Sequence, residues 1–416
     1  MQIRPILSTL RHHKLTAVLL TLQVAFTCAI VCNVAFMVAN RIRQVTLPTG
    51  LAESGLSMVK VVGITKDENV QARHAADLAA LRAIPGVQSA VAVDSLPLSR
   101  DESSYGTCNS LQSFNRAMAA HSMEGVGGCV NASVYCGSPG ELATLGLKLV
   151  EGRDFQPGEY LKSKGWELAD VPGAIVSREL AARLYPGKSA LGQSLYMGNR
   201  PPIRIVGVVD TLLRPQLRTP AVDQYSVLAP SLPDTNGTTY VLRSAPADRE
   251  RVLKDATEAL ARIDPDRLIP AKSARTYAQL RRSYFQRDTT MIGLLIASAL
   301  GLLFVTALGI AGLANFWVQQ RTRSIGIRRA IGATRGDILH YFQTENLLIV
   351  TAGIVLGALL AVALNLLLMT HYELPRLPLW YLPIGAAVLW ALGQLSVLSP
   401  ALRASNVPPV VATRSV

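Results

Sequence analysis

Long apolar runs without charged residues divide the chain into hydrophobic and polar regions. The first run covers residues 15–40, between Lys14 and Arg41, and three more cover about residues 289–317, 346–370 and 379–401. Each exceeds the about 20 residues that a helix needs to cross a bilayer. The pattern therefore predicts an α-helical membrane protein with four transmembrane helices. A cleaved signal peptide is the alternative for the first run, but the run is longer than the about 7–15 apolar residues of such peptides.

The region between the first two runs, residues 41–287, shows the shorter patterns of strands and helices. Its beginning predicts a strand, a helix and a strand, and its end repeats this order; the ranges are 57–64, 71–84, 87–93, 238–243, 248–263 and 267–269. Two β-α-β units separated by an insertion indicate a ferredoxin-like subdomain. We therefore expect a large α+β domain made of two subdomains, a ferredoxin-like one from residues 45–104 and 225–283 and an inserted one from residues 105–224.

Basic residues concentrate in the segments that flank the apolar runs. The chain has a formal net charge of +13, and ten of its Lys and Arg residues fall in residues 1–14, 318–345 and 403–416. The positive-inside rule predicts that these three segments are cytoplasmic, so residues 41–287 are expected to be extracytoplasmic. Because the rule accounts for these charges, and no groove-like basic stretch is present, we expect no binding to nucleic acid.

The segment 318–345 is the most basic of the three and carries Arg321, Arg323, Arg328, Arg329 and Arg335. Burying five arginines in a bilayer would cost more than about 10 kcal/mol, so this segment is expected to lie outside the hydrocarbon. Apolar residues recur in it at roughly helical spacing and predict a short amphipathic helix at the membrane surface: Ile325, Ile327, Ile331, Ile338 and Leu339. Its glycines are expected to be breaks or points of close approach: Gly326, Gly332 and Gly336.

Four glycines in the second apolar run are expected to let helices pack closely: Gly293, Gly301, Gly309 and Gly312.

Motifs for enzyme chemistry are missing from the sequence. The string Pro186-Gly187-Lys188-Ser189 resembles the end of a phosphate-binding loop, but Ala182 stands where that loop requires glycine. We interpret the string as a turn after a helix. Neither metal-ligand spacings nor a G-x-S-x-G setting occur. The chain is therefore not expected to be an enzyme, to hold a metal or to bind a cofactor of its own.

Three cysteines fall in the predicted extracytoplasmic domain, where disulfides persist: Cys108, Cys129 and Cys136. If residues 131–135 form a strand, Cys129 and Cys136 stand about 23 Å apart, too far for a bridge. Cys108 is then the partner of one of them, and we favour Cys129. Three free thiols remain the alternative.

Several strings resemble a known family of membrane proteins. The string RTRSIGIRRAIGATRGDI, followed by Thr344-Glu345 and an apolar helix, is similar to the cytoplasmic loop of MacB/FtsX-type ABC-transporter permeases. In the soluble region LATLGLKLVEGRDF, GAIVSRELAARLYPGKSALGQSLYM and IRIVGVVD resemble the family's periplasmic core domain. The ending PALRAS, residues 400–405, also resembles the family. The resemblance covers most of the chain and implies an FtsX-like membrane module at residues 288–402.

In this family the loop lies against the nucleotide-binding subunit, so the resemblance implies an ATPase-coupling site. Its residues are Arg321, Arg323, Ser324, Ile325, Gly326, Arg328, Arg329, Gly332, Ala333, Thr334 and Glu345. Family members commonly have Glu where this chain has Ser324. The departure removes one negative charge from the implied docking surface.

The resemblance also implies a function and a set of partners. We expect a permease subunit in a bacterial inner membrane, working with a second permease subunit and a dimer of separate ABC ATPase subunits that bind ATP and Mg. The soluble domain would move when the ATPases close, and this mechanotransmission would drive efflux of periplasmic substrates through a periplasmic adaptor protein and an outer-membrane channel. The alternatives are a lipoprotein-sorting permease, a regulator of cell-wall hydrolases, and a membrane-anchored ligand sensor without an ATPase.

Overall fold

The computed structural model describes residues 14–63, 69–123, 125–163, 168–198, 200–232, 237–264, 267–372 and 376–406. Most of the two predicted cytoplasmic ends, residues 1–13 and 407–416, lies outside these ranges. The chain divides into two compact units. We call Met1–Thr46 with Arg287–Val416 the membrane unit, and Leu47–Gln286 the soluble unit.

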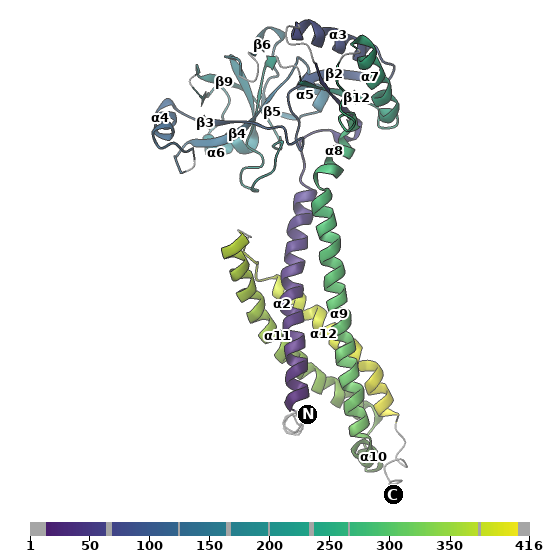
Figure 1. Ribbon diagram of the computed structural model, residues 1–416. Helices are drawn as coiled ribbons and strands as arrows, with labels where there is room; N and C mark the ends of the chain where they lie inside the picture. Colours follow the sequence, from purple (N-terminus) through teal and green to yellow (C-terminus); the bar gives the residue numbers. More distant parts are fainter. Residues whose placement is uncertain are drawn as a thin grey trace. The chain divides into compact units, whose positions relative to one another are not determined.

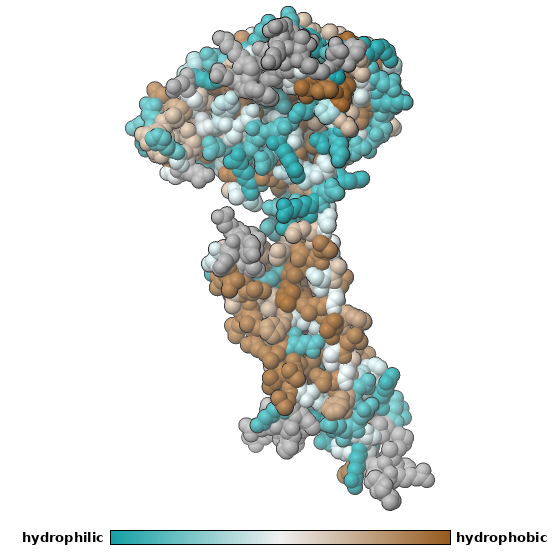
Figure 2. Space-filling model, in the orientation of Figure 1, coloured by the Kyte–Doolittle hydropathy of each residue, from teal (hydrophilic) through white to brown (hydrophobic). Residues whose placement is uncertain are grey.

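The membrane unit is built from four long apolar helices (Figure 1). They are α2 (Lys14–Val45), α9 (Gln286–Gln320), α11 (Arg335–Tyr372) and α12 (Tyr381–Ser405). Each contains a stretch long and apolar enough to cross a membrane, which confirms the four predicted spans. Figure 2 shows hydrophobic residues covering the sides of these helices, as expected for surfaces that face lipid.

The break between the second and third long helices is shorter than the predicted loop, residues 318–345. Helix α9 continues to Gln320, and α11 begins at Arg335, so residues 335–345 are the first turns of a membrane helix. Between the two long helices lie the short α10 (Thr322–Ala330) and a turn. The charge pattern predicted the position of the basic segment correctly. It did not predict where the helices end, because a membrane helix can continue beyond the bilayer into water.

Close helix packing uses glycines other than the predicted ones. An added Cβ at Gly293, Gly301 or Gly312 of α9 would have open space around it, and only Gly309 has a neighbour, Gln23. The tight contacts come from Gly353 and Gly357 of α11 and Gly385 of α12. Added Cβ atoms there would stand 2.7 Å from Val24 Cβ, 2.5 Å from Cys28 Cβ and 2.3 Å from Cys32 Sγ. Helices α11 and α12 therefore approach α2 through small residues.

The soluble unit begins and ends in a four-stranded antiparallel sheet with the order β13-β1-β12-β2. Its elements are β1 (Leu56–Val62), α3 (Val70–Arg82), β2 (Val87–Val93), β12 (Gly237–Ser244), α7 (Arg249–Ile263) and β13 (Arg275–Thr276). Two β-α-β units contribute alternate strands, which is the ferredoxin-like arrangement predicted from the sequence. The apolar face of the sheet packs against α3 and α7 through Val59, Leu81, Val252 and Leu260.

The fourth strand of this sheet is not where the sequence placed it. Residues 267–269 contribute only an isolated bridge between Leu268 and Val62, and β13 follows several residues later. Strand β13 has two residues, too few for an apolar alternation to reveal it.

The inserted subdomain contains a seven-stranded sheet with the order β5-β9-β7-β10-β4-β3-β8, and β8 also pairs with β9. This extra pairing closes part of the sheet into a ring around a core that includes Val134, Val176 and Ile205. Its elements are β3 (Ser103–Cys108), α4 (Leu111–Ala119), β4 (Cys129–Cys136), α5 (Glu141–Leu145), β5 (Leu149–Gly152), β7 (Gly173–Ser177), α6 (Arg178–Leu184), β8 (Ser194–Met197), β9 (Ile203–Val209) and β10 (Ser226–Ala229). A small separate ribbon pairs β6 (Leu161–Lys162) with β11 (Ser231–Leu232).

Two details of this subdomain bear on the sequence interpretation. Strand β10 lies between β4 and β7, so the insertion extends past residue 225 and the predicted boundary is too early. Residues 186–189 follow α6, where Lys188 N donates to Tyr185 O at 3.2 Å and Gly187 has a φ of 74°. This geometry confirms a turn after a helix.

The first and last segments of the soluble unit are tied together by Arg281 of α8 (Tyr277–Tyr284). Its guanidinium lies 2.6 Å from Glu53 Oε1 and donates to Leu47 O at 2.5 Å. Glu53 also accepts a hydrogen bond from Thr49 Oγ1 at 2.6 Å. The positions where the chain enters and leaves the soluble unit are therefore linked by charge-assisted bonds.

Candidate functional site

Helix α10 ends in a turn that only glycine fits without strain. Gly332 has a φ of 107°, in the left-handed region, and an added Cβ there would meet nothing within 4 Å. Ala333 N donates to Arg328 O at 3.0 Å and Gly332 N to Arg329 O at 3.2 Å, a glycine-terminated helix end. The glycine is therefore required by backbone conformation, and a close approach by another part of the described chain does not explain it.

Thr334 and Asp337 start the next helix. Asp337 N donates to Thr334 Oγ1 at 3.2 Å, while Thr334 N and Oγ1 donate to Asp337 Oδ2 at 2.9 and 2.6 Å. The pair is a reciprocal N-cap of α11. Thr334 thus has a local structural role that its place in the predicted site did not reveal.

The isoleucines do not form the single stripe that the sequence predicted. Ile325 and Ile338 are buried in the core of the membrane unit. Ile327 is 47% exposed and Ile331 is 82% exposed. The prediction failed for two reasons. Ile325 and Ile327 are two residues apart and so point to nearly opposite sides of α10, and Gly332 breaks the helix between Ile331 and Ile338. As a result Ile327 of α10 and Ile331, its C-cap residue, are two large apolar side chains that do not pack into the membrane unit.

Arg321 and Glu345 form a buried ion pair between the start of α10 and α11. Their Nη1 and Oε2 atoms are 2.7 Å apart, and the Glu345 side chain is 1% exposed. The Arg321 guanidinium also lies 5.7 Å from the centre of the Trp317 ring on α9. Removing one member of such a pair leaves an uncompensated buried charge. The contact therefore fixes α10 to both long helices beside it.

A second arginine ties α10 to α12. Arg329 Nη1 donates to Ser405 O at 3.1 Å, and Arg321 and Arg329 together attach α10 to the bundle. Ser324 Oγ donates to Arg321 O at 3.0 Å and is exposed, and Gly326 is buried next to Ile325. Arg323 is exposed on the outer side. The predicted site residues thus include anchors, which face the bundle, and Arg323, which is exposed. Ile327 and Ile331, which were not predicted as site residues, are exposed as well, and we call these three residues the outer face of α10.

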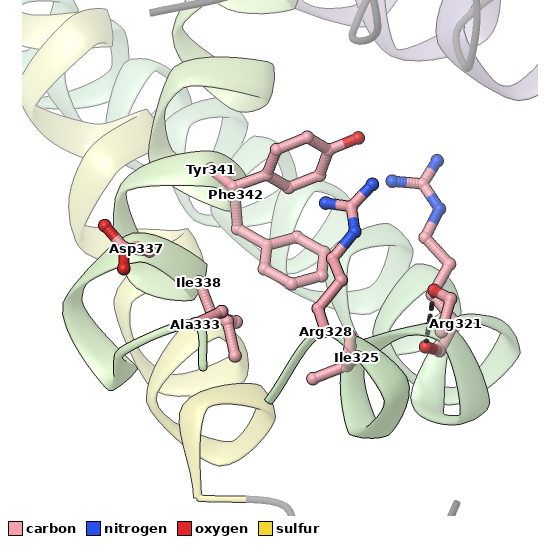
Figure 3. A pocket seen from close by; sticks show the side chains of 9 residues that line it. Arg321, Ile325, Arg328, Ala333, Asp337, Ile338, Tyr341 and Phe342 are labelled. Atoms are coloured by element: carbon pink, nitrogen blue, oxygen red, sulfur yellow. Dashed lines mark hydrogen bonds between the residues drawn. The ribbon is translucent and has the colours of Figure 1, made fainter. Parts of the chain in front are cut away.

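A pocket of about 370 Å³ lies between α10 and the first turns of α11 (Figure 3). Its lining includes five predicted residues, Arg321, Ser324, Ile325, Arg328 and Ala333. It also includes residues that sequence reasoning did not assign to the site, namely Asp337, Ile338, Tyr341 and Phe342. The Arg328 guanidinium lies 5.1 Å from the centre of the Tyr341 ring. The aromatic pair directly after a basic segment was the signal that could have revealed this pocket.

The predicted cysteine pair is joined in the soluble unit. Cys108 and Cys129 are register partners on β3 and β4, and their sulfur atoms are 2.00 Å apart. The bridge is buried beside Phe114 and Ala117 of α4. Cys136 lies at the far end of β4 as a free, half-buried thiol. The disulfide closes the segment that carries α4 onto the sheet.

The fold defines a polytopic membrane protein whose large α+β domain is inserted between its first two spans. Residues 15–259 match the family model described as the MacB-like periplasmic core domain, and residues 296–409 match the FtsX-like permease C-terminal model. The first match alone covers more than half of the chain. The chain therefore belongs to the MacB/FtsX family of ABC-transporter permeases.

Individual relatives match at lower identity. The macrolide export ATP-binding/permease protein MacB of Bartonella henselae is 29% identical over 307 residues, which are 68% of this chain and 43% of that protein. The uncharacterized ABC transporter permease YknZ of Bacillus subtilis is 26% identical over 290 residues, 68% of this chain and 70% of that protein. The crystal structure of the periplasmic region of MacB from Actinobacillus actinomycetemcomitans aligns with 13% identity and a TM-score of 0.35, covering 58% of this chain and 97% of that one. The chain spans less than half the length of the first of these relatives.

Proposed function

We propose that this chain is a non-enzymatic permease subunit that transmits force from a separate ABC ATPase to its own helices. The observation that carries the proposal is the two-sided construction of α10. Its inner side is fixed by Arg321 to Glu345 of α11 and by Arg329 to Ser405 of α12. Its outer side exposes Ile327 and Ile331. A partner that holds the outer side would pull on three long helices through contacts that already exist.

The chemistry of the outer face defines the ATPase surface that would fit it. Two exposed isoleucines beside Arg323 would fit an apolar depression on the ATPase with an acidic residue at its rim. In such an interface the apolar anchors supply affinity and the charges supply orientation. The ATPase would bind ATP and Mg, since this sequence carries no G-x-x-x-x-G-K-[ST] loop. The outer face, made of Arg323, Ile327 and Ile331, carries no negative charge of its own.

The charge pattern supports an orientation in the membrane. With the arginines of α10 in the cytoplasm, the soluble unit lies outside, in the periplasm of a bacterium with an inner membrane. The working assembly would contain a second permease subunit, either an identical or a related chain. Efflux through a periplasmic adaptor and an outer-membrane channel is the function we propose, supported by the relatives named for macrolide export.

Affinity capture of the chain from native membranes, followed by mass spectrometry, tests the proposal. We expect an ABC ATPase to copurify with the unmodified chain. The Ile331→Asp variant should recover at least about tenfold less ATPase, because a charge would be buried in the interface. Ile263→Asp, at an isoleucine 43% exposed on α7, is the matched control and should retain the ATPase.

Three outcomes of the capture experiment would contradict parts of the proposal. Equal ATPase recovery with both variants would show that the outer face of α10 is not the contact. Capture of lipoprotein carriers or amidase activators in place of an adaptor would favour the sorting or cell-wall roles over efflux. Recovery of no ATPase with the unmodified chain would favour a ligand sensor.

A further inference from the structure

The pocket between α10 and α11 is distinct from the proposed ATPase contact. Arg321, Ser324, Ile325 and Arg328 line it at positions i, i+3, i+4 and i+7, which is one face of a helix. Ile327 and Arg323 lie on another face of the same helix. An occupant of the pocket would therefore leave the outer face of α10 accessible.

The polar side of the pocket carries hydrogen-bond donors and positive charge, which suit an anion. In Figure 3 the guanidinium groups of Arg321 and Arg328 and the hydroxyl of Tyr341 gather on one side, and Asp337 lies on the other. Arg321 is already paired with Glu345, and both Asp337 contacts are directed to Thr334. Arg328 has no ion pair among the described residues, and only the Tyr341 ring contacts its guanidinium face. The pocket thus keeps one uncompensated cation with further N–H donors beside it.

The rest of the lining is apolar. Ile325, Ala333, Ile338 and Phe342 form this part, and Ile325, Ile338 and Phe342 belong to the core of the membrane unit. A free inorganic anion would leave this part of a pocket of about 370 Å³ without a partner. A ligand with a phosphate at one end and hydrocarbon at the other satisfies both halves.

The position of the pocket along the helices decides what such a ligand is. The pocket lies where α9 has just ended and α11 has just begun, and both helices contain candidate membrane spans. Lipid headgroups lie at this level, and basic pockets between transmembrane helices on the cytoplasmic side bind anionic headgroups. Phe316, near the end of α9, and Leu347, within the first turns of α11, are both exposed, so apolar surface for acyl chains exists at this level of the helices.

We propose that the pocket lined by Arg321, Arg328 and Tyr341 binds the phosphate of an anionic phospholipid. Arg328 would donate to the phosphate oxygens, Tyr341 would add its hydroxyl, and the first carbons of the lipid would lie against Ile338 and Phe342. The bound lipid would supply the counter-charge that Arg328 otherwise lacks and would fix α10 at the membrane surface. The site does not depend on any ATPase being present.

Native mass spectrometry of the full chain, released from nanodiscs, tests the site. The nanodiscs contain phosphatidylcholine with phosphatidylglycerol or without it, and the measured quantity is phosphatidylglycerol retained per chain. We expect Arg328→Gln to reduce retention by about tenfold, because a hydrogen bond to a charged group is lost. Arg323→Gln removes the same charge from the outer face and should change retention less than twofold.

Two further measurements separate the site from simpler explanations. Arg328→Lys keeps the charge and should retain most of the lipid, while a melting temperature equal to that of the unmodified chain shows that Arg328→Gln is folded. Equal losses from Arg328→Gln and Arg323→Gln would overturn the proposal in favour of diffuse surface attraction. Displacement of the lipid by inorganic phosphate at the same concentration would overturn it in favour of a free-phosphate site.

Discussion

The two units of this protein are stabilised by different kinds of interaction. The soluble unit buries charges in its interior, as in Arg214 with Glu102 and Arg267 with Asp77. The spans of the membrane unit pack through Gly353 and Gly357, with a few neutral hydrogen bonds such as that between Thr27 Oγ1 and Thr306 Oγ1 at 2.7 Å. Water drives apolar groups together in the first case, whereas in lipid close packing must supply the attraction.

The membrane unit uses a buried ion pair only at its end, in the described part of the chain. Arg321 and Glu345 lie outside the apolar centre of the spans, where α9 gives way to α10. Each charge there costs less to bury than at the middle of a bilayer. The comparison therefore predicts that the soluble unit is most sensitive to loss of charge, and the spans to gain of volume.

The largest effect should follow from removing Arg214. Its side chain is 1% exposed, and it contacts Glu102, Ser104 Oγ and Asn131 O. Arg214→Ala leaves Glu102 buried without its main partner, which should lower the free energy of unfolding by about 3–5 kcal/mol. Arg218 reaches the same carboxylate at 3.4 Å but is about half exposed, so Arg218→Ala should cost at most about 1 kcal/mol.

Urea unfolding of both variants in detergent, followed by tryptophan fluorescence and circular dichroism, measures this difference. Equal destabilisation by Arg214→Ala and Arg218→Ala would contradict the view that burial, and not contact alone, makes the pair important.

Features of the fold that depend on neighbouring residues in the chain were predictable. A membrane span needs about 20 successive residues without charge, so residues 15–40 were recognisable one stretch at a time. The ferredoxin-like subdomain followed from two repeated β-α-β patterns of ordinary length. The same kind of reasoning located the basic segment that contains α10.

Features that depend on distant pairings were not predictable. The closure of β8 onto β9 and the place of β10 between β4 and β7 are set by contacts between segments far apart in sequence. The face of a helix that Gly357 or Gly301 occupies depends on where its neighbours stand, and both look alike in the sequence. The pocket was missed because Tyr341 and Phe342 lie in the predicted loop 318–345, and only the structure shows that the first turns of α11 bring them against α10.

An intermediate effect should appear as a dependence of stability on pH. Burial raises the pKa of Asp94 to about 6, although the backbone N–H of Cys136 donates to its carboxylate at 2.9 Å. Burial also raises the pKa of the nearby Glu141 well above its usual value. Between about pH 4 and 6 the folded state thus holds more protons than the unfolded state.

Stability should therefore fall as the pH rises through this window, by on the order of 2–3 kcal/mol for Asp94. Asp94→Asn should flatten that part of the pH profile while Asn Oδ1 still accepts from Cys136. Asp170→Asn, at a carboxylate 68% exposed, is the control and should leave the profile unchanged. A profile of melting temperature from pH 4 to 8 that rises through the window would contradict the assignment.

The smallest of the three effects concerns volume in the spans. An added Cβ at Gly357 would stand 2.5 Å from Cys28 Cβ and 2.6 Å from Ala25 O, and the backbone oxygen cannot rotate away. Gly357→Ala should therefore force α11 away from α2 and cost about 1–3 kcal/mol. Gly301→Ala makes the same chemical change on α9 with open space around it, and should be neutral or stabilise its helix by up to about 1 kcal/mol. Because the two variants share helix propensity and hydrophobicity, a difference in their thermal unfolding in detergent isolates packing against α2. Should both variants melt at the same temperature, α2 and α11 would not be in the close contact on which the membrane unit is built.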